Sequence, residues 1–344
     1  MRILVGLIGG LLVVLMLAEF FVAFLLPRRV KRDPRIARGT YQAVWIPWRW
    51  VASRLRPLGA DALLGYFGPL ALLLELAVWV FGLIVGFACL QWAGGGGFSL
   101  DSSAGTFLSA SFEHVGAWHR GLGLVEAATA VGVLFTVIGY LPSVYSAYSL
   151  RENAISRLST RAGAPASAAG LLANGWEELE ATLGEAERWA TEMMETHLAY
   201  PLLAYYRSQH VGQSWLSALT AITDTSAVVL AAVEDGTPGI RPAELAYRVG
   251  RHALADLAHQ LADGAGGRER ELTEEDTAEL RSLLEVSGLP LVPVGECRER
   301  LDRLRAEYEP DALELAQQLA LRLPPWRPDE QALKRRKLVP AYRR

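Results

Sequence analysis

Two long apolar segments, separated by a shorter one, constrain what this chain can fold into. Tyr66–Trp92 is about 27 residues long and contains a single charge, Glu75. At 1.5 Å per residue, a helix of that length exceeds the roughly 30 Å of hydrocarbon in a bilayer. Gly121–Tyr148 has a similar length and also carries one charge, Glu126, near its start. Both segments are therefore predicted to span a membrane.

The sequence between these two segments is too short to cross a bilayer but apolar enough to enter one. Gly94–Gly97 is a glycine run, Ser102 and Ser103 follow it, and Ala104–Phe112 is a short apolar segment. Backbone that enters a bilayer without crossing it has to be shielded by protein or face water, because an unpaired amide in lipid costs several kcal/mol. We therefore expect Ala104–Phe112 to form a re-entrant helix inside a collar of other helices or subunits.

Composition indicates that the chain is divided between membrane and water. With 51% hydrophobic residues it is too apolar for an ordinary soluble protein, and with 21% charged residues it is too polar to lie wholly in a membrane. Cys89 lies in a predicted span and Cys297 in the charged C-terminal half, so no disulfide or cysteine–metal framework is expected.

The N-terminal sequence predicts a third span and sets the topology. Ile3–Leu26 is an apolar run of about 24 residues, interrupted only by Glu19 and without the small-residue cleavage site of a signal peptide. The arginine-rich loop that follows is expected to stay in the cytoplasm by the positive-inside rule. The N-terminus is then outside, the C-terminus is cytoplasmic, and the predicted location is the plasma (inner) membrane.

Glycine pairs occur in two of the predicted spans. Gly6 and Gly10 are four residues apart, as are Gly82 and Gly86. Such pairs can form a groove that admits a close neighbouring helix, although glycine is also simply frequent in membrane helices.

Tryptophan and arginine gather between the first two predicted spans. Tyr41–Trp50 contains three tryptophans and is followed by Arg54 and Arg56. Such residues suit the headgroup layer, where the ring is half buried and the cation meets anionic lipid. We expect this segment to contact anionic headgroups; nucleic-acid binding is disfavoured because the segment lies between two spans.

The order of a span, a short pore helix, a Val-Gly dipeptide and a second span resembles the two-helix pore domain of potassium channels, whose filter loop reads Thr-Val-Gly-Tyr-Gly. The filter-like loop here comprises Glu113, His114, Val115, Gly116, Ala117 and Trp118. The span after it is similar to the inner helix of a bacterial branch of that family. The resemblance implies a homotetrameric pore that passes monovalent cations along its axis. Ala117 and Trp118 depart from the family pattern, so the implied selectivity is non-standard.

Several polar residues near the loop are candidates for the pore mouth. Glu113 either contributes to an acidic ring that attracts cations or pairs with Arg120 or His119. His114 and His119 either titrate near neutral pH or are merely solvated. Glu126 either reaches the mouth or pairs within the helix bundle.

The last predicted span contains two residues that permit bending. Gly139 and Pro142 mark the place, because proline removes a backbone hydrogen bond and clashes with the preceding turn. This feature is interpreted as the hinge of a gate or as a static kink.

From Arg151 onward the pattern is that of charged, amphipathic helices. A linker is predicted over Gly163–Gly170 and a helix over Trp176–Tyr200. Ser214–Val233 is interpreted as a buried helix of a soluble bundle, with a fourth span as the alternative. A helix-capping box is predicted at Thr273–Asp276.

The predicted fold is an all-α membrane protein with three transmembrane helices, a re-entrant loop between the last two, and an all-helical cytoplasmic C-terminal domain. Its parts are an N-terminal span (1–27), a basic cytoplasmic or interfacial linker (28–65), a pore-like module (66–148), a helical domain (149–323) and a basic, mobile tail (324–344).

No catalytic or phosphate-binding motif occurs in the sequence, and the glycine clusters at Gly94–Gly97 and Gly264–Gly267 follow no predicted strand. We therefore expect no enzyme activity, no cofactor and no metal site. Two functions remain: a homotetrameric cation pore, or a non-conducting membrane scaffold or sensor that keeps the pore architecture and signals through its cytoplasmic domain.

Overall fold

The structure is a computed structural model that describes residues 1–344 except 25–35, 96–99, 110–116, 211, 263–269 and 328–344. The chain divides into two compact units, Met1–Ser146 (unit 1) and Ala147–Arg344 (unit 2). One helix, α6 (Ala117–Ala162), belongs to both. All regular elements of the described residues are helices, apart from an isolated β-bridge between Val233 and Leu291.

Unit 1 contains the most apolar of the described helices. In order they are α1 (Arg2–Phe24), α2 (Ile36–Ala52), α3 (Pro57–Gly65), α4 (Phe67–Ala93), α5 (Leu100–Ser109) and the first part of α6. Within the described residues, the helical stretches long and apolar enough to cross a membrane are Arg2–Phe24, Gly59–Ala93, Trp118–Ala162 and Trp215–Ala232. The second and third contain the predicted spans Tyr66–Trp92 and Gly121–Tyr148, and the first covers the predicted span Ile3–Leu26 up to Phe24, beyond which residues 25–35 lie outside the described part. The last predicted span is part of a longer helix, since α6 continues past Tyr148 to Ala162.

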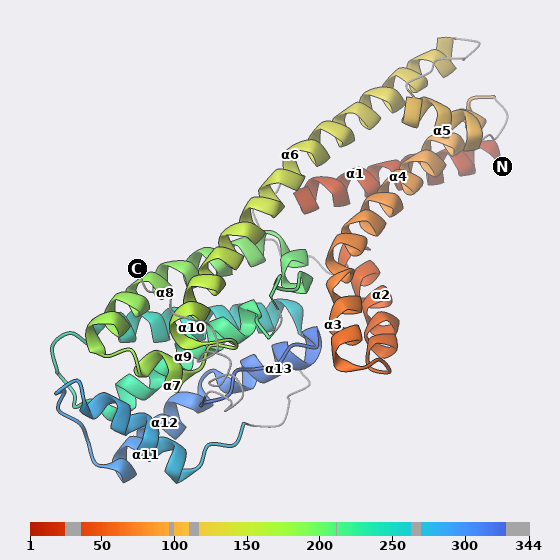
Figure 1. Cartoon of the computed structure of the whole chain (residues 1–344). Coiled ribbons are helices and arrows are strands. Elements are labelled where there is room, and N and C mark those ends of the chain that lie inside the picture. The colour runs from red at the N-terminus through yellow and green to blue at the C-terminus, as the bar shows by residue number, and fades with distance from the viewer. Residues whose placement is uncertain (25–35, 96–99, 110–116, 211, 263–269, 328–344) are drawn as a thin grey trace, which may run out of the picture. The chain divides into compact units, whose positions relative to one another are not determined.

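The glycines of α1 and α4 allow these helices to pack closely, side by side (Figure 1). A Cβ atom added at Gly6 would lie 2.7 Å from Ala93 Cβ, and one at Gly86 would lie 2.7 Å from Val13 Cγ2. At Gly9, which the sequence pattern does not single out, an added Cβ would lie 2.7 Å from the Gly86 carbonyl oxygen. Gly10 has only an ordinary contact, 3.7 Å from Leu90. One glycine of each pair, Gly6 and Gly86, thus serves helix packing within one chain, whereas the space around Gly10 does not require a glycine.

Helix α2 contains the tryptophan-rich segment of the predicted interfacial linker. Trp45 is buried with its ring 4.6 Å from that of Phe67, and the Trp48 indole nitrogen donates to the Leu63 carbonyl oxygen at 3.0 Å. The Tyr41 hydroxyl donates to the carboxylate of Glu75, which is buried in α4. Trp50 is exposed, and the Arg54 guanidinium lies 3.2 Å from the centre of its ring.

The short helix between the two long ones begins earlier than predicted. It is already helical at Leu100 instead of Ala104 and is described as far as Ser109, because residues 110–112 lie outside the described part of the chain. Asp101 lies in its first turn, where a carboxylate complements the helix dipole. Phe107 is buried in the same apolar core as Val13 and Trp79, so α5 packs into unit 1.

Unit 2 is a bundle built around one apolar helix. It comprises the end of α6, α7 (Ala168–Leu172), α8 (Trp176–Ala199), a 3-10 helix (Pro201–Tyr205), α9 (Trp215–Ala232), α10 (Arg241–Leu261), α11 (Glu274–Glu285), α12 (Val294–Ala306) and α13 (Glu309–Leu319). Helix α9 contacts α7, α8 and α10–α13, and 94% of its apolar stretch is buried. Ser214–Val233 is therefore buried among the helices of unit 2, as predicted, and its place in a soluble bundle stays a prediction.

Two predictions for this unit are wrong. Ala168–Gly170 is not part of a linker but begins α7, which Ser167 caps by accepting a hydrogen bond from the Gly170 amide. The C-terminal tail does not begin at Pro324, because Trp326 is only 5% exposed and lies beneath the guanidinium groups of Arg270 and Arg305. Both errors arise from reading glycine and proline as loop signals where long-range packing decides the structure.

Candidate functional site

A buried polar cluster joins the three helices of the predicted pore module. Glu126 of α6 and Ser103 of α5 are fully buried, and Gln91 of α4 is 5% exposed. Gln91 Nε2 donates to Glu126 Oε2 at 2.7 Å. The Ser103 hydroxyl contacts Glu126 Oε1 and, at 3.0 Å, the carbonyl oxygen of Ile84. Of the two sequence-based alternatives for Glu126, the structure matches pairing within the bundle.

His119 lies at the edge of this cluster. Its Nε2 atom is 3.3 Å from the Gln91 carbonyl oxygen, so a histidine with a proton on Nε2 donates to α4. Arg120, the neighbouring candidate for the pore mouth, is exposed in the first turns of α6. The structure thus brings His119 and Glu126 to the same residue of α4, Gln91. Arg120 is exposed to solvent and is not part of this cluster.

Most of the filter-like loop, namely Glu113, His114, Val115 and Gly116, lies outside the described residues. Its last two positions, Ala117 and Trp118, are in the first turn of α6. A helical carbonyl points along the helix axis toward the amide four residues on, and does not face sideways into an ion path. Only positions before Ala117 can therefore supply carbonyls to a filter.

Trp118 has a packing role that also explains one residue of the glycine run. A Cβ atom built on Gly94 would lie 2.1 Å from the Trp118 indole nitrogen. Gly94, which the sequence marks only as part of a flexible loop, is thus the surface against which Trp118 lies at the end of α4. Trp118 itself remains 61% exposed.

The predicted hinge lies within an unbroken helix. Helix α6 continues through Gly139 and Pro142, and the Ser143 hydroxyl donates to the Gly139 carbonyl oxygen at 3.2 Å. No other side chain would meet a Cβ added at Gly139 within 4 Å. Gly139 therefore has no packing role within the described part of the chain.

Arg151 and Glu152, which sequence reasoning did not single out, anchor α6 in unit 2. The Arg151 guanidinium is buried and donates to the carbonyl oxygens of Leu203 and Tyr206, both at 2.9 Å. Glu152 pairs with Arg151 at 3.0 Å and accepts a hydrogen bond from the Gln209 amide. The sequence signal that could have identified them is two adjacent residues of opposite charge shortly after a predicted span.

His197 of α8 completes this anchor as a neutral side chain. Its Nδ1 atom donates to the Met193 carbonyl oxygen at 2.8 Å, and Nε2 accepts from Arg151 at 3.2 Å. Burial, and secondarily the Arg151 charge, lower the pKa of His197 to about 3. A ring that accepts at one nitrogen has to be neutral, so geometry and electrostatics agree.

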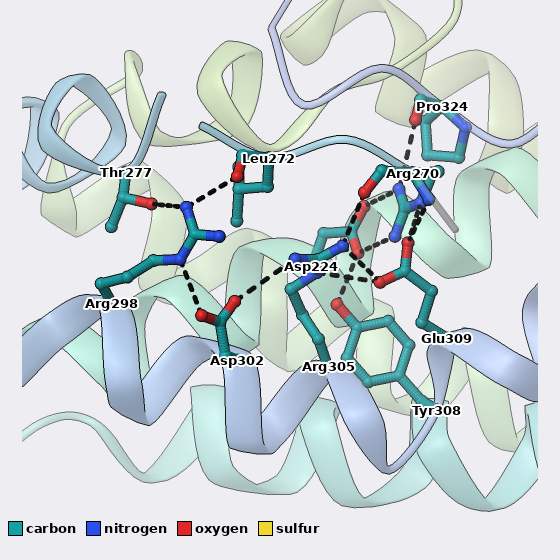
Figure 2. A network of polar contacts seen from close by, with 10 residues as sticks. All are labelled: Asp224, Arg270, Leu272, Thr277, Arg298, Asp302, Arg305, Tyr308, Glu309 and Pro324. Carbon is teal, nitrogen blue, oxygen red and sulfur yellow. Dashed lines mark hydrogen bonds and ion pairs between the residues drawn. The ribbon is translucent and has the colours of Figure 1, made fainter. Parts of the chain in front are cut away.

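A second buried polar network holds the far side of unit 2 together (Figure 2). Asp224, on the core helix α9, accepts from Arg270 at 2.7 and 2.8 Å and from the Tyr308 hydroxyl at 2.6 Å. Glu309 binds Arg270 and Arg305, both at 2.8 Å. Burial alone would lower the pKa of Arg270, but the Asp224 carboxylate outweighs it and raises that pKa. Because every charge shown is paired, the network fits a structural role.

A shallow groove lies between α6 and α8 within unit 2. Its volume is only about 40 Å³; it opens to solvent and is lined by apolar side chains with Arg157, Arg161 and Glu185 among them. Arg161 is paired with Glu178 and Glu185, both at 2.9 Å. In the described part of the chain there is no group of three or more histidine, cysteine or acidic side chains placed to hold a metal ion.

Comparisons of the chain with protein-family models, with curated proteins and with solved structures find no match.

Proposed function

We propose that this chain is a non-enzymatic integral membrane protein whose unit 1 forms a channel-like pore module. In this proposal α1, α4 and α6 cross the membrane, and α5 is a re-entrant helix between α4 and α6. Helix α5 has 10 residues and is about 15 Å long, half the roughly 30 Å of hydrocarbon in a bilayer.

The contact between Ser103 and Ile84 is the observation that carries this proposal. Ile84 lies nine residues before the end of α4, or about 14 Å along the helix. Helix α4 has 27 residues and is about 40 Å long, so each end extends about 5 Å beyond the hydrocarbon if the helix is centred. Ser103 then lies about 9 Å inside it, which is the depth expected of a re-entrant helix.

One chain supplies one such helix, so a conduction path requires several copies around an axis. We propose a homotetramer that passes monovalent cations with non-standard selectivity. Leu134, Phe135 and Ile138 of α6 are each more than half exposed in the single chain. These apolar side chains suit contact with lipid or with another copy.

We propose that the N-terminus lies outside and the C-terminus in the cytoplasm of a plasma (inner) membrane, because the sequence after α1 is basic and the positive-inside rule keeps such loops in the cytoplasm. Trp50, stacked under Arg54 and exposed, suits an anionic headgroup layer. Unit 2 then acts as a cytoplasmic regulator, connected to the last span through Arg151 and Glu152.

Ion flux from the purified full chain in liposomes, together with its subunit number, tests this function. We expect four copies and a cation flux that Glu113→Gln or Gly116→Ala reduces. A tetramer that passes no cation at any voltage or pH, or a monomer, would refute conduction.

A second function, a non-conducting scaffold or sensor, is favoured by one observation. The helical placement of Ala117 and Trp118 removes two positions from the filter-like loop. In that case signals pass through α6 into unit 2 without ion flow. Two results together would support this function: liposomes that show no ion flux, and a conformational change in unit 2 when the membrane is altered.

A further inference from the structure

The oxygens around Glu126 outnumber the hydrogens that the neighbouring hydroxyl can supply. The Ser103 hydroxyl has two acceptors within bonding distance, Glu126 Oε1 and the Ile84 carbonyl oxygen. A hydroxyl carries a single hydrogen, so it makes one full hydrogen bond or shares its hydrogen between the two acceptors. A bound proton or metal cation would give the second oxygen–oxygen contact a positive charge of its own.

The carboxyl group also has no cationic partner among the residues that the structure describes. None of the ion pairs there includes Glu126, and its hydrogen-bond partners, Ser103 and Gln91, are neutral. An isolated carboxylate is costly to bury away from water, because the charge loses its hydration. Binding one positive charge removes that cost.

The charge and the donor atoms indicate the class of ligand. Glu126 supplies one negative charge, which a monovalent cation cancels and a divalent cation would exceed. The surrounding ligands are oxygens: the carboxylate, the Ser103 hydroxyl, the Ile84 carbonyl and, after rotation of its amide, Gln91 Oε1. Oxygen ligands are those that replace the hydration shell of alkali cations in membrane proteins.

We propose that Glu126, Ser103, Gln91 and the Ile84 carbonyl form a binding site for one monovalent cation, a proton or Na⁺. With a proton, Glu126 Oε1–H donates to Ser103 Oγ, the Ser103 hydroxyl donates to the Ile84 carbonyl, and Gln91 Nε2 donates to Glu126 Oε2. With Na⁺, the same oxygens coordinate the ion. The site rests on the membrane placement of unit 1 proposed above.

The helices around Glu126 carry other ionisable groups, which could also respond to a change of pH. Glu75 accepts from Tyr41, His119 contacts the Gln91 carbonyl, and Asp101 is exposed in the first turn of α5. The remaining ones on α1, α4 and the unit 1 part of α6 are Arg2, Glu19, Cys89, Arg120, Tyr140 and Tyr145. A pH response is therefore assigned to Glu126 by labelling at that residue, not by the total response of the protein.

The test is modification of Glu126 by a lipid-soluble carbodiimide, which reacts with protonated carboxyl groups, read by mass spectrometry on the full chain in detergent. If the ligand is a proton, labelling of Glu126 falls as the pH rises. If Na⁺ competes, replacing choline chloride with about 100 mM NaCl lowers labelling about tenfold for a dissociation constant of about 10 mM. Ser103→Ala weakens the Na⁺ effect, whereas Ser143→Ala, whose hydroxyl bonds only within α6, leaves it unchanged.

Infrared spectroscopy provides a second readout that does not depend on access of the reagent. A protonated Glu126 gives a carboxylic-acid band that Glu126→Gln removes, and NaCl removes the same band in the unaltered chain if Na⁺ binds. Absence of both the labelling and the band at every pH and salt would overturn the site. If Glu126 responds to cations but the protein passes no ions, conduction is refuted and the site stands. If the protein conducts ions but Glu126 does not respond to cations, the site is refuted and conduction stands.

Discussion

Replacing Asp224 with alanine tests whether the buried network of unit 2 stabilises the fold. Asp224 is fully buried, and its carboxylate accepts two hydrogen bonds from Arg270 and one from Tyr308. Removing it leaves Arg270, whose side chain is 13% exposed, with less negative charge around it. Breaking a buried pair in this way costs about 3–5 kcal/mol.

Hydrogen exchange, measured by mass spectrometry on the full chain in detergent, gives the loss of stability in each helix. A loss of about 3–5 kcal/mol speeds exchange of the α9 amides by about a hundredfold to several thousandfold, since about 1.4 kcal/mol is a factor of ten. Tyr308→Phe removes one hydrogen bond but leaves the ion pair, and we expect a loss of about 1 kcal/mol.

The matched control is an ion pair of the same unit in a different environment. Asp235 pairs with Arg300 at 3.0 Å, but its side chain is 89% exposed. Asp235→Ala should change stability by at most about 1 kcal/mol, because water and salt screen exposed pairs. A change of less than tenfold in α9 exchange for Asp224→Ala, or an equal effect for Asp235→Ala, would refute the assigned role.

Three further changes test other parts of the structure. Gly86→Leu should separate α1 from α4, because a Cβ there already lies 2.7 Å from Val13, whereas Gly10→Ala should be tolerated; engineered disulfide crosslinking between the two helices measures this, and equal crosslinking in both variants would contradict it. His197 is neutral when folded and has a pKa of about 3, so its contribution is complete above pH 6.5 and falls by about 1.4 kcal/mol per pH unit as the pH drops toward 3. His197→Gln should lessen that pH dependence of the thermal midpoint, and an unchanged pH profile would argue against a buried neutral ring. Thr273→Ala removes the hydrogen bond that the Asp276 amide donates to the Thr273 hydroxyl but keeps the bond from the amide of residue 273 to the Asp276 carboxylate; it should cost about 1 kcal/mol, read as faster exchange in α11 alone.

Local patterns in the sequence were sufficient for the long apolar helices and for several helix ends, but not for the short helix α7. The apolar runs predict α1, α4 and the unit 1 part of α6, and the capping box at Thr273 is confirmed with both of its reciprocal bonds. The burial of α9 was also predictable, since Asp224 and its threonines interrupt an otherwise apolar run in a charged region. These features depend on residues within one or two helical turns.

The polar sites were only partly predictable, because their partners are distant in the sequence. Glu126 is an evident candidate, but Gln91 lies 35 residues before it and Ser103 lies 23 residues before it. Asp224 and Tyr308 are 84 residues apart. Nothing in helical periodicity indicates which residues of different helices meet, so the cluster and the network required the structure.

The depth of α5 tests the central claim most directly. A spin label at Leu108, a residue of α5 that is 74% exposed in the single chain, can be compared in lipid nanodiscs with labels at Phe81 of α4 and at Val286 of unit 2. If α5 enters the membrane, a water-soluble relaxation agent reaches position 108 as poorly as position 81. Relaxation at position 108 equal to that at position 286 would show that α5 lies in water, and the pore module would then be contradicted.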